Sequence, residues 1–373
     1  MQSKQSGRSW LLLLCLLQLQ GSLSAQTLLI GTYTNKGSEG IYVYHFDTVS
    51  ATASFRSVAP SSNPSFLAVA PGGKQVFAVQ ENNPGTVTSF RVNTASGVLQ
   101  LVNTVASAGA HPCYVAAHPS GRWLAVGNYS SGNLSLYRIE TDGSLSEALQ
   151  TINHSGSSIN QSRQREPHVH ATVFTADGKL LLVPDLGTDQ VRRYRFDATA
   201  GKLSPANPAF LALPPGAGPR HLELHPLKKI VYVMNELSGT VAVFATVGKT
   251  QRLLQEISSH PEGFSGTTGS ADIHLSPDGR HLYCSNRGSA NNLAIFSVQK
   301  NGTLVPAGHT PVQGIQPRNF TIHPSGNFVL VANQGSDAVV IFRRDPVTGK
   351  LTDTGSRINV SQPVCLQWLE GNR

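Results

Sequence analysis

Short runs of alternating apolar and polar residues recur along the chain from Leu28 onward, separated by tight turns that contain glycine. Residues 218–244 show the unit in full, with the sequence GPRHLELHPLKKIVYVMNELSGTVAVF. The unit holds an alternating stretch, a turn, an apolar stretch, a polar loop and a third stretch that ends in an aromatic residue. Alternation with a period of two residues predicts β-strands with one buried face. After residue 25 the sequence has no long stretch with the periodicity of an amphipathic helix.

The unit is repeated along the chain, in segments 63–90, 111–137, 168–194, 269–296 and 316–342. The first position of its first strand is occupied in turn by Ser65, Cys113, His170, Arg220, Ala271, Arg318 and Val364, which lie 46 to 57 residues apart. A fourth, more variable strand follows each unit. Four short antiparallel strands in a repeat of this length are typical of a β-propeller blade, which buries its faces by stacking against neighbouring blades.

The two ends of the chain predict how the ring of blades closes. Residues 28–46 resemble the second and third strands of a unit whose first strand is missing, and residues 362–371 resemble a first strand without followers. Pairing the two ends makes one composite blade beside six complete ones. We therefore predict an all-β, seven-bladed propeller over residues 26–373, with one blade closed jointly by N-terminal and C-terminal strands.

Residues 1–25 have a different pattern. Lys4 and Arg8 precede an apolar run from Trp10 to about Leu19, and small residues follow up to Ala25. This layout predicts a secretory signal peptide that is cleaved near Ala25, and the apolar run is too short to span a bilayer. We therefore expect an exported protein, periplasmic or extracellular, with no membrane span in its mature form.

Composition and charge narrow the class of partner. Only 13% of the residues are charged, and the chain has 35 Gly and 22 Pro, as expected for a protein rich in strands and turns. The formal charge is +8, and removal of Lys4 and Arg8 leaves 8 − 2 = +6. The basic residues are scattered, which disfavours nucleic acid as a partner. A modest positive field favours an anionic small molecule. The oligomeric state is not indicated.

Cysteine and histidine usage adds further expectations. Cys113, Cys284 and Cys365 remain after cleavage, and their odd number and wide spacing indicate buried free thiols rather than a disulfide framework. We expect a first group of histidines to be solvated turn residues at the edge away from the strand starts: His118, His225 and His323. A second group is expected in loops without a pattern of partners: His154, His260 and His309.

Polar side chains are predicted to meet at one mouth of the propeller channel. The first and second strands of a blade are antiparallel, so the start of the first and the end of the second lie at one edge of the sheet. Besides the seven strand-start residues, the neighbours His168, His221 and Asp272 fall at this edge. The strand ends contribute Glu81, Tyr129, Asp185, Asn235, Glu236, Asn286, Arg287, Asn333 and Gln334.

Such a cluster is suited to anion binding and proton transfer. Arginine offers paired donors to a carboxylate or phosphate, and histidine exchanges protons near neutral pH. A polar lining that merely faces channel water is the structural alternative. A metal site built on His168, His170 and His221 is a weaker alternative, because no set of acidic ligands accompanies the histidines. We therefore predict no metal site.

Taken together, these motifs are similar to those of a known family. GPRH (218–221), Asn235-Glu236, ADIHLSPDGRHLY (271–283), Asn286-Arg287, QPRNFTIHPSG (316–326) and GTYT (31–34) resemble, in the same order, the lactonase family of seven-bladed propellers. That family includes propeller-type 6-phosphogluconolactonases and a carboxy-muconate cyclase. The resemblance implies lactone chemistry without a cofactor, and its functional histidine, arginines and glutamate fall on His170, Arg220, Glu236 and Arg287.

The main hypothesis is a lactone hydrolase acting on an anionic lactone or sugar acid. His170 would activate water, Arg220 and Arg287 would bind the substrate anion or the oxyanion, and Glu236 would orient these groups or donate a proton. The remaining candidates for substrate binding are His168, His221, Arg318, Tyr129, Glu81 and Asp272. Two alternatives stay open, a non-catalytic module that binds a sugar acid or a protein, and a muconate-type cycloisomerase. The expected export also leaves it open whether the substrate is phosphorylated.

Overall fold

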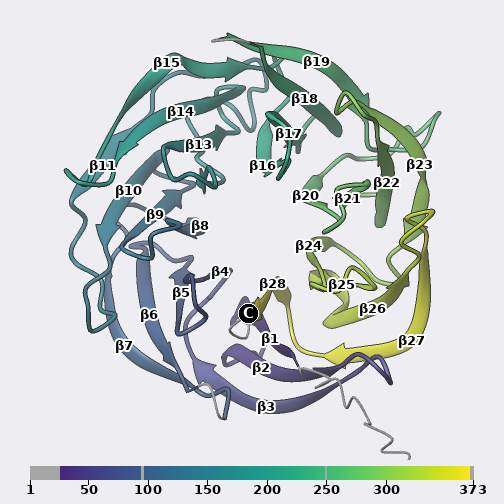
Figure 1. The fold of residues 1–373 in the computed structure, drawn as a ribbon, viewed down its shortest axis with the longest axis horizontal. Helices are drawn as coiled ribbons and strands as arrows, with labels where there is room; N and C mark the ends of the chain where they lie inside the picture. The colour runs from purple at the N-terminus through teal and green to yellow at the C-terminus, as the bar shows by residue number, and fades with distance from the viewer. Residues whose placement is uncertain (1–25, 94–95, 248–249, 370–373) are drawn as a thin grey trace, which may run out of the picture.

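The computed structural model describes residues 26–93, 96–247 and 250–369, which form seven four-stranded antiparallel sheets around a central channel (Figure 1). The predicted all-β, seven-bladed propeller is therefore confirmed. The predicted signal peptide, residues 1–25, lies outside the described residues. In each sheet the first strand lines the channel and the fourth strand lies at the outer rim.

The strands are grouped into blades as follows. Blade 1 contains β28 (Pro363–Leu369), β1 (Gln26–Thr32), β2 (Gly40–Asp47) and β3 (Thr52–Pro60). Blade 2 contains β4 (Phe66–Val69), β5 (Gln75–Gln80), β6 (Thr86–Val92) and β7 (Leu99–Ala106). Blade 3 contains β8 (Pro112–Ala117), β9 (Trp123–Asn128), β10 (Asn133–Arg138) and β11 (Gln150–Asn153). Blade 4 contains β12 (Val173–Phe174), β13 (Leu180–Asp185), β14 (Gln190–Asp197) and β15 (Lys202–Ala212).

The remaining three blades complete the ring. Blade 5 contains β16 (Pro219–Leu224), β17 (Ile230–Asn235), β18 (Thr240–Val247) and β19 (Thr250–Ser258). Blade 6 contains β20 (Ser270–Leu275), β21 (His281–Asn286), β22 (Asn292–Val298) and β23 (Leu304–Pro311). Blade 7 contains β24 (Pro317–Ile322), β25 (Phe328–Asn333), β26 (Ala338–Arg344) and β27 (Leu351–Asn359), with the short 3₁₀ helix η1 (Gln334–Ser336) between β25 and β26.

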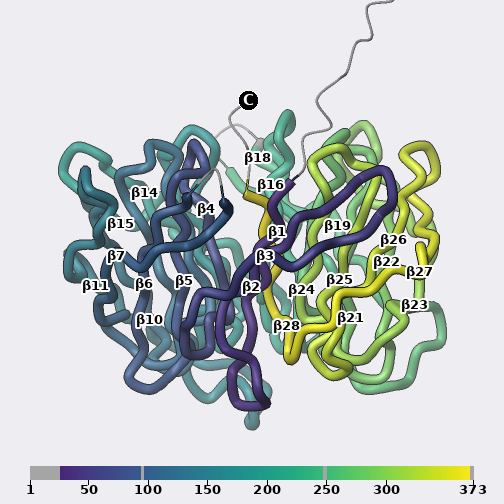
Figure 2. The backbone as a smooth tube through the Cα atoms, turned by 90° about the horizontal axis from the view of Figure 1, so that it is seen from below, coloured from purple at the N-terminus to yellow at the C-terminus, as the bar shows by residue number. Residues whose placement is uncertain are grey.

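Blade 1 is formed by strands from both ends of the chain, as the sequence predicted. β28 pairs antiparallel with β1, with Leu29 opposite Gln367 and Gly31 opposite Cys365. Figure 2 shows the yellow β28 running beside the purple β1 within this blade. Because the sheet of blade 1 contains strands from both termini, hydrogen bonds close the ring and leave no open side.

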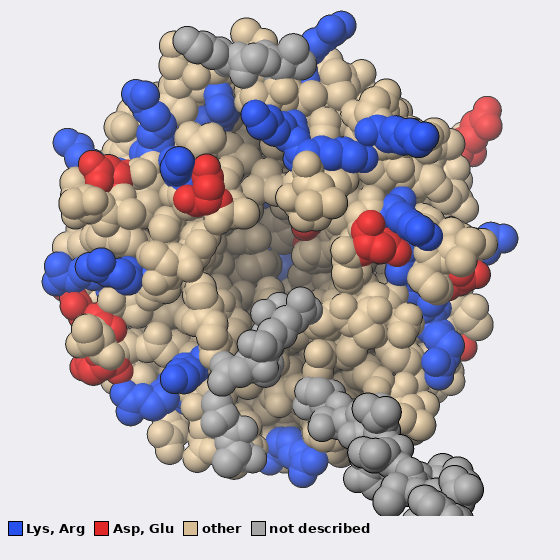
Figure 3. Space-filling view, in the orientation of Figure 1, with Lys and Arg blue, Asp and Glu red and all other residues tan. Residues whose placement is uncertain are grey.

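Burial follows the order of the strands in a blade. Every residue of β9, β17, β21 and β25 is buried, because these second strands are covered on both faces by neighbouring blades. Outer strands such as β3 are mostly exposed. The apolar clusters therefore lie between blades, and the channel is left to polar residues. On the face shown in Figure 3 the molecule is hollowed at its centre, and the Lys and Arg side chains are spread over the blades.

One expectation about the histidines is wrong. His118, His225 and His323 are buried rather than solvated. They lie in the turns between first and second strands, but each of these turns packs against a neighbouring blade. His118 Nε2, for example, lies 3.0 Å from the carbonyl oxygen of Gly178, in the corresponding turn of blade 4.

Two members of the second group, His154 and His309, have hydrogen-bond partners, whereas both ring nitrogens of His260, in the loop after β19, have none within the described part of the chain. His154 Nδ1 lies 2.8 Å from Asp185 Oδ2, and His154 Nε2 lies 3.0 Å from the hydroxyl of Tyr194. His309 lies in β23 rather than in a loop, with Nε2 3.0 Å from the carbonyl oxygen of Ser259. These histidines connect the fourth strands to their surroundings.

The expectation for the cysteines is confirmed. Cys113, Cys284 and Cys365 are buried free thiols. Burial raises the pKa of each thiol. In the described part of the chain, no helix has the length and the apolar content needed to cross a membrane.

Candidate active site

Several inner strands begin with a β-bulge, which places side chains such as Arg220 and Arg318 at the channel mouth. In blade 5, Pro219 pairs with Asn235 but His221 pairs with Met234, so Arg220 is an extra residue in the ladder. Strict alternation would send Arg220 and His221 to opposite faces, whereas a bulge lets neighbouring side chains serve one site. The same irregularity occurs around Cys113 in blade 3 and Arg318 in blade 7.

The segment before β16 explains the glycine of the GPRH motif. Gly218 has φ of +66°, and a Cβ atom there would lie 2.4 Å from Leu237 Cγ. Its carbonyl oxygen accepts a hydrogen bond of 2.7 Å from the backbone N–H of Glu236. The glycine therefore allows the start of β16 to approach the end of β17 closely enough to set Arg220 beside Glu236.

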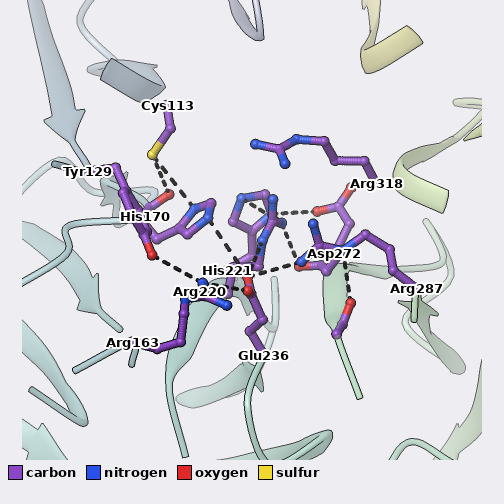
Figure 4. A network of polar contacts seen from close by, with 12 residues as sticks. Cys113, Tyr129, Arg163, His170, Arg220, His221, Glu236, Asp272, Arg287 and Arg318 are labelled. Carbon is purple, nitrogen blue, oxygen red and sulfur yellow. Dashed lines mark hydrogen bonds and ion pairs between the residues drawn. The ribbon is translucent and has the colours of Figure 1, made fainter. Parts of the chain in front are cut away.

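Glu236 is the centre of the arginine cluster (Figure 4). Its Oε2 atom forms ion pairs of 3.1 Å with Arg220 Nε and 3.1 Å with Arg287 Nη2. Its Oε1 atom accepts a hydrogen bond of 2.8 Å from Arg163 Nη2. Three guanidinium groups, from three different segments, thus surround one carboxylate.

The backbone fixes two of these arginines further. Arg220 Nη1 donates to the carbonyl oxygen of Ala271 at 2.8 Å, and Arg287 Nε donates to the carbonyl oxygen of Gly269 at 2.8 Å. Both carbonyl groups belong to the start of blade 6. The guanidinium planes are therefore held before any substrate arrives, which is the preorganisation that anion recognition requires.

The charges of this cluster shift one another's protonation. Burial alone would raise the pKa of Glu236, but Arg287, Arg220 and Arg163 outweigh burial and lower it to about 2. Burial together with Arg287 and Arg318 lowers the pKa of Arg220 to about 10. At neutral pH Glu236 is ionised and the arginines are charged, so the cluster carries more positive than negative charge.

His170 lies beside this cluster in a neutral form. Its Nε2 atom is 4.0 Å from Glu236 Oε2, which is too long for a direct hydrogen bond, and its Nδ1 atom is 3.7 Å from Cys113 Sγ. Burial, Arg220, His221 and Arg318 lower the pKa of His170 well below its usual value. A neutral imidazole next to an anion-binding cluster is able to accept a proton from water.

Tyr129 and His168 form one wall of the site. Their rings are stacked with centroids 4.4 Å apart, and the ring of His170 meets Tyr129 edge-on at 5.3 Å. The hydroxyl of Tyr129 accepts a hydrogen bond of 3.1 Å from Arg163 Nη2. Within PHVHA, His170 is therefore the residue that approaches Glu236, while His168 packs flat against Tyr129. The first strand of this blade is shorter than expected and begins only at Val173.

Arg318 and Glu81 form a second charged group at the same mouth. Arg318 Nη2 lies 3.9 Å from Glu81 Oε2, and its guanidinium lies 5.3 Å from the ring centroid of Tyr33. The Tyr33 hydroxyl donates to Glu81 at 2.8 Å. This group has no direct contact with Glu236 among the described residues, although Arg318 influences the pKa of both His170 and Arg220.

His221 and Asp272 lie one step further down the channel. His221 Nδ1 is 2.7 Å from Asp272 Oδ1, and Arg220 Nη1 lies 3.2 Å from His221 Nε2. Asp272 also contacts His274 Nε2 at 3.0 Å. Burial and Arg220 lower the pKa of His221 to about 4, so the ring is neutral. It can therefore accept a hydrogen bond from Arg220 Nη1.

The strand-end residues fall into two classes that the sequence did not separate. The last residue of the second strand is structural in several blades. Asn128, Asn286 and Asn333 each donate to a carbonyl oxygen just beyond the fourth strand of the preceding blade. The next residue along the chain faces the mouth instead, as Tyr129, Glu236 and Arg287 do.

Arg163 is the main site residue that the sequence did not suggest. It lies between β11 and β12, outside the repeated unit, where the spacing from Cys113 to His170 is 57 residues. This spacing is the longest of the series, and the extra length was the available signal. Tyr33, in the GTYT motif, was also missed. Within residues 26–93, 96–247 and 250–369, no group of three or more His, Cys, Asp or Glu side chains is placed to hold a metal ion.

With this geometry in hand, comparison with known proteins identifies the family. A family model described as "Lactonase, 7-bladed beta-propeller" matches residues 27–368. The chain belongs to the lactonase family of seven-bladed β-propellers. The resemblance drawn from the motifs is thereby confirmed.

Relatives of the family cover nearly the whole chain. The 6-phosphogluconolactonase of Formosa agariphila is 36% identical over 346 residues, covering 91% of this chain and 98% of the relative. The 6-phosphogluconolactonase of Bacillus subtilis is 32% identical over 346 residues, covering 91% of this chain and 97% of the relative. The solved structure of a periplasmic gluconolactonase from Pseudomonas aeruginosa has a TM-score of 0.90 at 40% identity, covering 94% of this chain and 100% of the other. The chain is thus a 6-phosphogluconolactonase-like lactonase.

Proposed function

We propose that the chain is a lactone hydrolase that opens a sugar-type lactone to its hydroxy acid at the channel mouth. The observation that supports this most directly is the position of His170, whose Nε2 atom lies 4.0 Å from the Glu236 carboxylate that three arginines contact. The site therefore places a proton acceptor beside fixed cationic donors. Ester hydrolysis needs both, a base for water and donors for the oxyanion.

The proposed reaction assigns a task to each group. His170 takes a proton from water as the water oxygen attacks the lactone carbonyl carbon. Arg220 and Arg287 stabilise the negative charge that develops on the carbonyl oxygen. The bond between the acyl carbon and the ring oxygen then breaks, and the protonated His170 returns its proton to the departing alkoxide. The sum is lactone plus water giving hydroxy acid.

Glu236 has an orienting role in this proposal. A carboxyl group with its pKa lowered to about 2 is ionised at neutral pH and has no proton to donate. Its two oxygens instead hold Arg163 on one side and Arg220 with Arg287 on the other. His221 and Asp272 support Arg220, while Tyr129, His168, Arg318 and Glu81 complete the walls that contact substrate.

Export is the second part of the proposal. The layout of Lys4, Arg8 and the apolar run that follows is that of a signal peptide. The Pseudomonas aeruginosa relative at 40% identity is named a periplasmic gluconolactonase. We therefore infer that the mature chain, from about residue 26, lies in the periplasm or outside the cell.

A panel of lactones tests the hydrolase directly. The purified protein would be assayed in a pH-stat with glucono-1,5-lactone and 6-phosphogluconolactone, and with a carboxymuconate in a spectral assay. His170→Ala should lower kcat by roughly 10²–10⁴-fold, the usual contribution of a general base. His45→Ala, in β2 at a distance from the channel mouth, is the matched control and should keep its activity.

Each other outcome selects a different function. Tight binding of a sugar acid without turnover by the unaltered protein would favour the non-catalytic module. Turnover of the muconate alone would favour the cycloisomerase. Lactone opening that persists in both His170→Ala and Arg220→Ala would reject the assignment of these residues.

A further inference from the structure

Arg163 differs from the other arginines of the site in its exposure and in its place in the fold. Its side chain is 40% exposed, against 2% for Arg220, 13% for Arg287 and 17% for Arg318. It belongs to the segment between β11 and β12 rather than to a blade strand. Figure 4 shows it reaching Glu236 from the side opposite Arg287.

The segment that carries Arg163 is anchored without the help of Arg163. The side chain of Gln164 is fully buried, and its Nε2 atom donates to the carbonyl oxygen of Leu186 at 2.8 Å and to Asp189 Oδ1 at 2.7 Å. The hydroxyl of Ser158 donates to the other oxygen of Asp189 at 2.5 Å. The backbone position of Arg163 is therefore fixed, while its guanidinium remains free to exchange partners.

Glu236 does not need Arg163 for its own neutralisation. Its Oε2 atom already contacts Arg220 and Arg287, each at 3.1 Å. Arg163 adds a third positive charge to a single negative one. Two guanidinium groups are enough to neutralise and hydrogen-bond one buried carboxylate. The third positive charge, on Arg163, is therefore available to bind a second anion.

We infer that Arg163 is a specificity-determining residue that binds an anionic group of the substrate away from the lactone ring. This inference rests on the proposed lactone hydrolase. Arg163 contacts the Oε1 atom of the same carboxylate whose Oε2 atom lies 4.0 Å from His170 Nε2. A group bound at Arg163 therefore lies beside the carboxylate oxygen that does not face His170, apart from the lactone carbonyl. A phosphate or carboxylate on the exocyclic end of a sugar lactone fits this placement.

The expected behaviour is a change of partner. When the substrate binds, the guanidinium N–H groups of Arg163 donate to the substrate anion instead of to Glu236. Glu236 retains its ion pairs with Arg220 and Arg287. A neutral lactone leaves Arg163 where it is. The residue therefore contributes to binding of anionic substrates and little to the chemical step, which Arg220, Arg287 and His170 perform.

The test compares a charged and a neutral substrate in matched variants. For Arg163→Gln, kcat/KM for 6-phosphogluconolactone should fall by about 10-fold or more, mainly through KM, as for the loss of a charge-assisted hydrogen bond. For glucono-1,5-lactone it should change by less than about threefold. Arg163→Lys should restore part of the loss because it keeps the charge without the fork.

The control variant is Arg138→Gln, which removes an arginine from an exposed ion pair of 2.8 Å with Glu140 on the same blade as Tyr129. It should leave the ratio of the two substrates unchanged. An equal effect of Arg163→Gln on both substrates, or no effect on either, would overturn the inference while leaving the hydrolase intact.

Binding of the two products keeps the inference testable if the unaltered protein opens neither lactone. In that case the proposed function fails by itself. Calorimetry with 6-phosphogluconate and gluconate then decides the role of Arg163. Weaker binding of 6-phosphogluconate alone in Arg163→Gln would support it, and equal changes for both acids would refute it.

Discussion

Glu236 and Asp272 are both buried carboxylates that face the central channel, Glu236 at the mouth after β17 and Asp272 further in on β20. Glu236 is surrounded by arginines, which carry full charges and more donors than one carboxylate can use. The arginines around Glu236 therefore have N–H groups in excess of those that the carboxylate accepts, and these groups lie together at the channel mouth.

Asp272 is satisfied in a different way. It accepts from His221 Nδ1 at 2.7 Å, from His274 Nε2 at 3.0 Å and from the backbone N–H of Phe320 at 3.2 Å, and the side-chain amide of Asn319 is a fourth donor. Donors and lone pairs are matched in number, and nothing is left to recruit a ligand. The two carboxylates thus differ in their donors: the cluster at Glu236 has a surplus, and the set at Asp272 is matched.

The largest effect is expected on stability, when Asp272 no longer accepts hydrogen bonds from all four of its donors. Asp272→Asn replaces one acceptor oxygen by an amide N–H₂ group that faces other donors, so buried donors lose their partner. Removing one member of a buried charged network costs roughly 3–5 kcal/mol of unfolding free energy. Chemical denaturation followed by tryptophan fluorescence measures this. A loss below about 1 kcal/mol would show that Asp272 is not the structural support described above.

The second largest effect is expected on activity, when the carboxylate that holds the surplus of arginine donors is replaced. Glu236→Gln keeps the shape of the side chain but no longer holds the guanidinium groups by charge, and we expect kcat/KM for glucono-1,5-lactone to fall by about 100-fold. The unfolding free energy should change less than in Asp272→Asn, and added sulfate should narrow the difference further by supplying the missing negative charge. Activity within a few-fold of the unaltered protein would contradict the orienting role of Glu236.

The contrast between the two carboxylates also shows what the sequence could predict. Ring closure and blade number were predictable because every blade repeats one pattern, and equivalent positions of a repeat must surround one axis. The same reasoning predicted that His170, Arg220, Glu236 and Arg287 would meet. It failed for Arg163 because that residue lies outside the repeat, where no equivalent position exists.

Two further features depend on atomic detail that a repeat pattern does not contain. A β-bulge lets Arg220 and His221 serve the same site, although simple alternation separates them. Adjacent strand-end residues, such as Asn286 and Arg287, look alike in an alignment of repeats, yet the first holds the preceding blade and the second contacts Glu236 at the channel mouth. Their roles follow from the direction of each side chain at the end of the strand.

The smallest effect is the pH dependence that Asp272 confers through His274. Burial alone would lower the pKa of His274, but Asp272 and Glu223 raise it to about 10. A raised folded-state pKa means that the stabilisation is fully present below the ordinary value of about 6.5 and is lost as the pH rises toward 10. Because the side chain of His274 is 35% exposed, solvent screens this contribution, and we expect only a small shift in melting temperature.

His274→Gln isolates this contribution, because glutamine still donates a hydrogen bond to Asp272 but does not titrate. The difference in melting temperature between the unaltered protein and His274→Gln should be largest near pH 6 and should shrink between about pH 6.5 and 10. Taking the difference removes the titration of other groups that both proteins share. Melting curves that stay parallel across this range would show that His274 is not held in its charged form by Asp272, and the matched set around Asp272 would then consist of neutral donors alone.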